Sequence, residues 1–128
     1  MTGGRIAWLI DGNNVMGSRP DGWWRDRRAA ARRLVGELAA FAAREGVPVT
    51  VVFDGAPFEV EVPDDAPLEV VFAARRGRDA ADDEIARRVA ASADPAGLAV
   101  VTSDAGLAQR VREHGAKVVP AGRFRSGL

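Results

Sequence analysis

The chain has 128 residues, with 18 Lys and Arg against 18 Asp and Glu, a single histidine and no cysteine. With 47% hydrophobic residues it has the composition of a globular protein, long enough to bury a core without disulfides or a structural zinc. The lack of cysteine excludes thiol catalysis and disulfide frameworks, and the lone His114 excludes a histidine-rich metal site. The first apolar run ends at Asp11, too short for a signal peptide or a membrane span. We therefore expect a soluble, cytoplasmic protein.

The predicted elements alternate between strands and helices along the chain. Short apolar, β-branched runs predict strands at residues 5–10, 49–53, 68–72, 98–101 and 117–119. Apolar residues at helical spacing predict helices at residues 25–45, 81–91 and 105–114. The alternating segment Phe58–Val62 predicts a small edge strand, and residues 120–128 have too little pattern to be assigned any structure.

This order of elements predicts the fold class. Strands joined by helical crossovers form a mostly parallel sheet with helices on both faces. We therefore expect an α/β protein with a three-layer α/β/α architecture and about five strands. We expect one domain over residues 1–128, with its core at about 5–119 and a short C-terminal tail.

Three of the predicted strands end in an acid, at Asp11, Asp54 and Asp104. The carboxyl ends of parallel strands share one edge of the sheet, where ligands bind in such folds. A further acidic segment, Asp79 to Glu84, begins the helix after the third strand and opens on the same edge. We therefore expect these carboxylates to converge.

Clustered carboxylates raise one another's pKa unless a cation offsets their charge. All-oxygen ligand sets suit Mg²⁺ or Mn²⁺, either of which can make a bound water nucleophilic and stabilise charge on phosphoryl oxygens. Each acid also has an ordinary structural role open to it. Asp11 and Asp54 precede glycines in turn-forming pairs, while Asp82, Asp83, Ser103 and Asp104 suit helix N-termini.

Other constellations are weaker. The chain has neither GxGxxG after a strand nor a P-loop, and no histidine is placed by the sequence to activate Ser103. The loop arginines Arg75, Arg76 and Arg78 could hold a phosphate backbone, or could be solvated loop charges. Trp23 and Trp24 could stack on bases, or could pack the start of the first long helix.

Four motifs together resemble a known family: Leu9 to Asn14 (LIDGNN), Val51 to Gly55 (VVFDG), Ala81 to Ile85 (ADDEI) and Val101 to Asp104 (VTSD). In this order and spacing the sequence is similar to NYN domains, and particularly to the YacP-like branch within the PIN-like nuclease superfamily. The similarity runs from about Arg5 to Val119.

The resemblance implies a PIN-like fold and a metal-dependent endoribonuclease that hydrolyses RNA phosphodiester bonds with Mg²⁺ or Mn²⁺. The catalytic residues that it implies are Asp11, Asp54, Asp82 and Asp104. The implied metal ligands are Asp11, Asp82 and Asp104, with Asp83 as the rival of Asp82. Asn14 matches the polar residue that accompanies Asp11, and Ser103 is a supporting hydrogen-bonding residue, whereas Asn13 stands where many relatives carry an aromatic residue.

The leading hypothesis is therefore cleavage of single-stranded or unpaired RNA. Asn14, Ser103, Arg75, Arg76, Arg78 and Trp23 are the candidate substrate contacts. The ribosome and other RNA-processing proteins are candidate partners; no membrane contact is expected.

Two other interpretations stay open. The first is a non-catalytic RNA-binding or interaction module with the same fold. The second is a phosphotransfer or phosphatase domain, whose strands also end in acids. Against the latter, Asp11 is followed two positions on by Asn13 instead of a second acid, and the only lysine, Lys117, begins the last strand.

Overall fold

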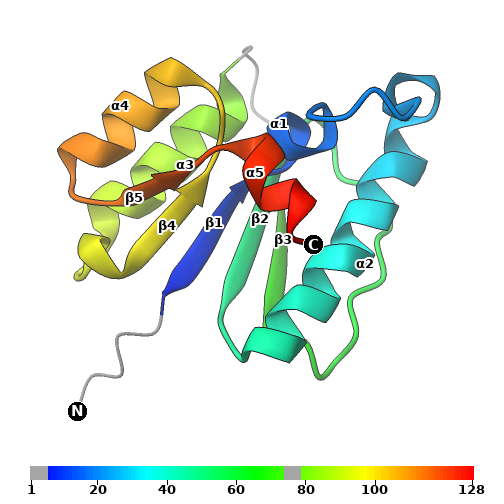
Figure 1. Ribbon diagram of the computed structural model, residues 1–128, viewed down its shortest axis with the longest axis horizontal. Helices are drawn as coiled ribbons and strands as arrows, with labels where there is room; N and C mark the ends of the chain where they lie inside the picture. Colours follow the sequence, from blue (N-terminus) through cyan, green and yellow to red (C-terminus); the bar gives the residue numbers. More distant parts are fainter. Residues whose placement is uncertain (1–5, 74–78) are drawn as a thin grey trace.

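In the computed structural model, which describes residues 6–73 and 79–128, five strands form one parallel sheet (Figure 1). The strands are β1 (Ala7–Asp11), β2 (Val49–Asp54), β3 (Leu68–Ala73), β4 (Leu98–Val101) and β5 (Lys117–Val119). The helices are α1 (Gly12–Met16), α2 (Arg27–Glu45), α3 (Ala80–Ala91), α4 (Ala105–Glu113) and α5 (Ala121–Ser126), and 3-10 turns form η1 (Trp23–Arg25) and η2 (Pro95–Gly97). The predicted α/β class with a parallel sheet is confirmed.

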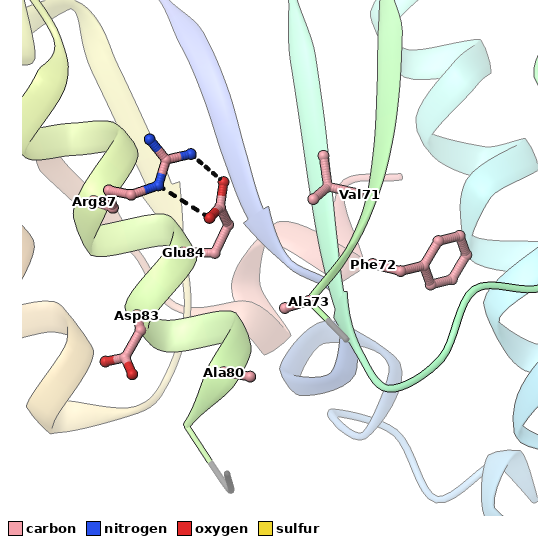
Figure 2. A pocket seen from close by; sticks show the side chains of 7 residues that line it. All are labelled: Val71, Phe72, Ala73, Ala80, Asp83, Glu84 and Arg87. Atoms are coloured by element: carbon pink, nitrogen blue, oxygen red, sulfur yellow. Dashed lines mark hydrogen bonds and ion pairs between the residues drawn. The ribbon is translucent and has the colours of Figure 1, made fainter. Parts of the chain in front are cut away.

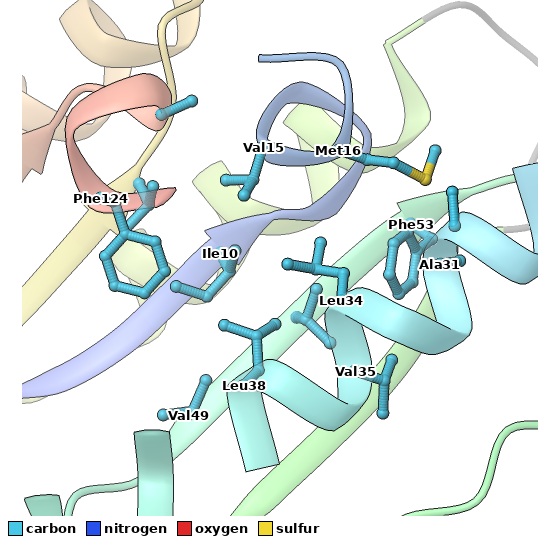
Figure 3. Packing of buried hydrophobic residues seen from close by; sticks show 14 of the residues in the cluster. Ile10, Val15, Met16, Ala31, Leu34, Val35, Leu38, Val49, Phe53 and Phe124 are labelled. Carbon is cyan, nitrogen blue, oxygen red and sulfur yellow. The ribbon is translucent and has the colours of Figure 1, made fainter. Parts of the chain in front are cut away.

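Helices cover both faces of the sheet, with α3 and α4 on one side and α1, α2 and α5 on the other (Figure 1). Neighbouring residues of a strand point to opposite faces, so each strand serves two cores. Ile10 and Val51 pack toward α2, whereas Leu9 and Val52 pack toward α3 and α4. Figure 3 shows the first of these cores between α2 and the sheet, where Leu34 of the helix lies over the strands.

Helix α2 has a defined signal at each end. The side chain of Asp26 accepts a hydrogen bond from the backbone N–H of Ala29 at 3.0 Å, which caps the first turn. Gly46 ends the helix with a φ of 64°, and its N–H donates to the carbonyl of Ala42. The predicted start at Arg25 was wrong by two residues because Trp23–Arg25 form a separate turn before the cap.

The predicted edge strand at Phe58–Val62 is absent, because this segment pairs with no strand. The apolar side chains of Phe58, Val60 and Val62 do pack against the α2 core. However, the backbone carbonyl of Glu59 accepts a hydrogen bond from Arg32 of α2 at 3.1 Å. The alternation therefore predicted which side chains face inward. The segment adds no strand to the sheet, but it packs against α2 and, through the ring of Phe58, against Phe72 of β3 at 5.0 Å.

The C-terminal residues, to which the sequence assigned no structure, form α5. Phe124 is only 7% exposed and its ring lies 5.3 Å from the rings of both Trp8 and Phe41. Arg125 is also buried, donates to the carbonyl of Val15 in α1 at 3.2 Å and forms an ion pair with Asp21. A six-residue helix is too short to show a helical period, so its packing was not predictable from the pattern.

The strand order reverses beside β1. The sheet runs β3-β2-β1-β4-β5, so the chain moves outward from β1 to β3 and then returns to β4 on the other side of β1. Ligands of open parallel sheets bind where the order reverses, at the carboxyl ends of the strands. That place is between the ends of β1 and β4. No helix within residues 6–73 and 79–128 combines the length and apolar character needed to cross a membrane.

Candidate active site at the carboxyl edge of the sheet

Asp11 is the last residue of β1 and is only 5% exposed. Thr102, which follows the neighbouring strand β4, donates a hydrogen bond from its hydroxyl to Oδ2 of Asp11 at 2.9 Å. Burial raises the pKa of Asp11 from 3.8 to about 6, although the hydrogen bonds from Thr102 and from the backbone of Asn14 favour the ionised form. The charge of Asp54 adds to the increase. Asp11 is therefore a buried acid that is costly to ionise without a cation.

Asp82 lies in the first turn of α3 and is half-buried. Burial, followed by the charges of Asp11, Asp104, Asp79 and Asp54, raises the pKa of Asp82 from 3.8 to about 7. Segments far apart in the sequence therefore bring their carboxylates into one electrostatic environment. We call Asp11, Asp54, Asp82 and Asp104 the edge carboxylates.

The other two edge carboxylates are exposed and each caps a helix with one oxygen. Oδ1 of Asp54 accepts a hydrogen bond from the backbone N–H of Ala81 at the start of α3, at 2.9 Å. Oδ1 of Asp104 accepts one from Leu107 in α4, also at 2.9 Å. Neither Oδ2 has a hydrogen-bond partner among the described residues. The expected capping role of Asp104 is therefore compatible with a second role for its other oxygen.

The acids that follow Asp82 on α3 have basic partners. Glu84 accepts hydrogen bonds from Arg87 and Arg88, and those from Arg87 are drawn in Figure 2. These bonds lower the pKa of Glu84 to about 2. Asp83 forms an ion pair with Arg110 of α4 at 2.9 Å. Asp82 and Asp83, which the sequence left as rivals, therefore differ: Asp82 interacts with the strand-end acids, whereas Asp83 contacts the neighbouring helix.

Two asparagines of α1 hold the loops on either side of β1. Oδ1 of Asn13 accepts the backbone N–H of Asp54 at 2.8 Å, and Oδ1 of Asn14 accepts that of Ser103 at 2.7 Å. The hydroxyl of Ser103 in turn accepts the N–H of Ala121 at the start of α5. Asn14 and Ser103 were predicted to touch substrate, and here their side chains organise the edge. Sequence reasoning missed this role for Asn13.

A glycine is required directly after Asp11. A Cβ on Gly12 would lie 2.6 Å from ring carbons of Phe53, much closer than atoms can approach. This close packing lets α1 begin at the end of β1 and face β2. The Asp-Gly pair, expected as a turn, here leads straight into a short helix.

The tryptophans separate into one packed ring and one exposed ring. Trp23, predicted to contact substrate, packs partly buried against the α2 core, with the guanidinium of Arg27 5.4 Å from its centre. Trp24 is 50% exposed, with the guanidinium of Arg25 5.9 Å from its ring centre. The predicted phosphate-binding residues Arg75, Arg76 and Arg78 lie outside the described residues.

The edge carboxylates have the chemistry of a divalent-cation site, although their oxygens are not gathered around one point. Among residues 6–73 and 79–128, no lysine or arginine forms an ion pair with any of them. Within the same residues, no group of three or more acids or histidines is close enough to hold a metal ion. Carboxylate oxygens are the ligands that Mg²⁺ and Mn²⁺ prefer, so the chemistry of these side chains fits such an ion. To bind one, the side chains must move closer together.

Comparisons with known proteins agree with this architecture. Two crystal structures of Rae1 (YacP) from Bacillus subtilis are similar to the chain. The W164L mutant has a TM-score of 0.72 at 25% identity, with 95% of this chain and 76% of that chain covered. The other has a TM-score of 0.70 at 24% identity, with 94% and 74% covered. No match was found among curated proteins. Residues 8–128 match the YacP-like NYN domain, and the chain therefore belongs to this family, whose members are generally nucleases of the PIN-like superfamily.

Proposed function

We propose that the protein is a metal-dependent endoribonuclease that hydrolyses phosphodiester bonds of single-stranded or unpaired RNA at the edge carboxylates. The observation that carries this proposal is the electrostatic influence of Asp11, Asp54, Asp82 and Asp104 on one another at the carboxyl edge of the sheet. Together with burial, these charges raise the pKa of Asp82 to about 7, with no described basic side chain to neutralise them. Family membership supports a nuclease activity in general terms.

Asp11, Asp82 and Asp104 would hold Mg²⁺ or Mn²⁺, with Asp54 completing the negative edge. The bound cation would supply Lewis-acid stabilisation of charge on the phosphoryl oxygens and activate a water for attack. Asp83 is the weaker candidate ligand because its carboxylate is engaged with Arg110. Thr102 orients Asp11 through the bond to Oδ2, and its hydroxyl also accepts the N–H of Asp104 at 3.1 Å. One hydroxyl thus connects two of the three ligands.

Asn13 and Asn14 would act on catalysis through position. By holding the backbones of Asp54 and Ser103, they fix the loops that carry the outer carboxylates. Arg75, Arg76 and Arg78 are proposed to bind backbone phosphates, as arginines do through charge and bidentate hydrogen bonds. The ribosome and other RNA-processing proteins remain candidate partners.

Cleavage of an end-labelled single-stranded RNA in Mn²⁺ or Mg²⁺ tests the proposal. We expect cuts at internal bonds that require the metal, and a loss of at least about 100-fold in rate when Asp11→Asn and Asp104→Asn are combined. Cleavage that survives EDTA, or that persists in the double variant, contradicts the mechanism.

A second candidate is an RNA-binding module without turnover, favoured by the finding that no described trio of acids is gathered for a metal. Isothermal titration calorimetry with Mn²⁺ separates the two. Metal uptake that is lost in the double variant supports the nuclease. RNA binding with no metal uptake supports the module.

A further inference from the structure

We propose that the cavity between α2 and the end of β2 binds one nucleotide of a single-stranded RNA, with its phosphate held by Arg27 and Arg28. This inference rests on the proposed function, because it assigns the position of a neighbouring part of the same RNA strand.

The cavity opens beside the edge carboxylates. It has a volume of about 230 Å³, and Asn13 and Asp54 line one of its sides. Pockets that hold drug-sized ligands start at about 300 Å³, so this one can enclose the base of a nucleotide, with the sugar and phosphate outside at its rim. An RNA strand with its scissile bond at the edge carboxylates could therefore place an adjacent nucleotide here.

The lining combines an apolar floor with a basic rim. Met16, Ala31 and Phe53 line the cavity and also belong to the α2 core, where Figure 3 shows them near one another beside the first turns of the helix. Arg27 and Arg28 contribute the basic side. A nucleotide has the matching division, because its base offers an apolar face and its phosphate is an anion.

The charges of Arg27 and Arg28 are not neutralised within the described residues. Both lie in the first turn of the 19-residue helix α2, where the nearby acid, Asp26, uses its side chain to cap the N–H of Ala29. Cations are electrostatically unfavourable at a helix N-terminus, where the helix dipole favours anions. A phosphate bound here would be stabilised by both guanidinium groups and by the dipole. Neither guanidinium has an ion-pair partner among the described residues, which leaves both available to bind an anion.

Aromatic rings hold the two guanidinium groups in place. Arg27 lies 5.4 Å from the ring centre of Trp23, and Arg28 lies 5.4 Å from that of Phe58. Arg32 lies 5.3 Å from the same Phe58 ring. Such cation–π contacts limit the motion of long side chains, so less conformational entropy is lost when an anion binds. This gives Trp23 and Phe58 a role in positioning the arginines instead of stacking on a base.

Fluorescence anisotropy of a labelled single-stranded RNA in EDTA measures binding without turnover. The test variant is R27Q/R28Q. The matched control is R33Q, which removes an exposed positive charge from the same helix but does not line the cavity. We expect the double variant to raise Kd about 10-fold or more, and R33Q less than about threefold. The slope of log K against log salt should become shallower by about 0.7 for each RNA phosphate that the variant no longer neutralises.

A charge-retaining variant separates charge from fold. Arg27 and Arg28 are exposed and oppose the helix dipole, so R27Q/R28Q should not lower the thermal midpoint below that of the wild type, measured by circular dichroism. R27K/R28K should recover part of the affinity, since lysine keeps the charge but loses the bidentate geometry. Equal effects of R27Q/R28Q and R33Q, or wild-type protein that does not bind the RNA, overturn the nucleotide site.

Cleavage assays distinguish the two proposals from each other. With Mn²⁺ present, R27Q/R28Q should raise KM while leaving kcat within about threefold. If the wild type cleaves RNA but the double variant behaves like R33Q, the nucleotide site is wrong and the nuclease stands. If the wild type never cleaves but the contrast in Kd persists, the nuclease is wrong and the nucleotide site stands.

Discussion

Two acids on the same helix, Asp82 and Glu84, have opposite electrostatic environments. The pKa of Asp82 is raised to about 7 by burial and by neighbouring carboxylates, whereas that of Glu84 is lowered to about 2 by hydrogen bonds from Arg87 and Arg88. Both lie near the beginning of α3. Glu84 is part of an ion-pair network that stabilises the folded chain, while Asp82 is held where its negative charge is costly.

Two pairs of neighbouring arginines also differ in whether an acid neutralises their charge. Arg87 and Arg88 are neighbours on α3 and both pair with Glu84. Arg27 and Arg28 are neighbours on α2, have no acidic partner among the described residues and line the cavity beside Asp54. The ion-paired arginines therefore belong to the network around Glu84, whereas the two without an ion pair lie beside an edge carboxylate.

The largest expected effect concerns cleavage by single variants of these two acids. D82N should lower the metal-dependent rate by about 100-fold or more, because it removes a proposed ligand. E84Q should change it less than about threefold, since it alters only the ion-pair network. The measurement is kcat/KM on labelled RNA in Mn²⁺. Similar losses in both variants would break the distinction, and a strong effect of D83N in their place would identify Asp83 as the ligand from α3.

Stability should respond to the same pair with opposite signs. In EDTA at pH 7.5, D82N should raise the free energy of unfolding by about 1–2 kcal/mol, a figure reduced for the solvent screening of a half-buried group. E84Q should lower it by about 0.5–1 kcal/mol, because it breaks a surface network. Urea unfolding followed by circular dichroism measures both. A destabilised D82N would show that Asp82 has a favourable partner in the folded chain.

The pH dependence of these effects lies in two different windows. The folded pKa of Asp82 exceeds its ordinary value of 3.8, so the folded chain holds an extra proton and stability falls as pH rises from about 4 to about 7. The folded pKa of Glu84 lies below 4.5, so its contribution is present above that pH and is lost as pH falls toward 2. D82N should flatten the upper decline in part, because Asp11 titrates in the same direction with a pKa of about 6.

The sequence could predict which acids lie at the carboxyl edge of the sheet, but not the side-chain hydrogen bonds that connect them to neighbouring segments. Asp11, Asp54 and Asp104 follow apolar runs, and parallel strands bring their ends to one side, so the placement of these acids along one edge followed from strand order alone. The hydrogen bonds of Asn13 and Asn14 reach loops about 40 and 90 residues away along the chain. No local pattern encodes such contacts. The partner of Asp83 is likewise set by the packing of α3 beside α4.

Residues with two physical options were the hardest to assign. Trp23 and Trp24 are adjacent residues of the same type, so the sequence gives no reason to treat them differently. In the structure Trp23 packs on the core and Trp24 is exposed, because the η1 turn points the two side chains in different directions. The segment Phe58–Val62 has the alternation of a strand but has no strand to pair with. In each case the local sequence pattern allowed two conformations or environments, and contacts with distant parts of the chain determined which one formed.

The smallest expected effect on activity comes from substituting Thr102, whose hydroxyl bonds to both Asp11 and the backbone of Asp104. T102V keeps the shape of the side chain but removes the bond to Oδ2 of Asp11 and the acceptor for the N–H of Asp104. That bond lowers the pKa of Asp11, so its loss should move the acid limb of the kcat/KM profile upward by about 0.5–1 pH unit.

T102S is the matched control because serine retains the hydroxyl, and its acid limb should stay within about 0.2 pH unit of the wild type. A T102V limb that does not move would mean that Asp11 does not titrate in the rate profile. The ionisation that controls activity would then belong to Asp82, whose raised pKa arises from burial and like charges with no contribution from this hydroxyl. The two acids can therefore be separated by one methyl-for-hydroxyl exchange, because the hydroxyl of Thr102 lowers the pKa of Asp11 and does not act on that of Asp82.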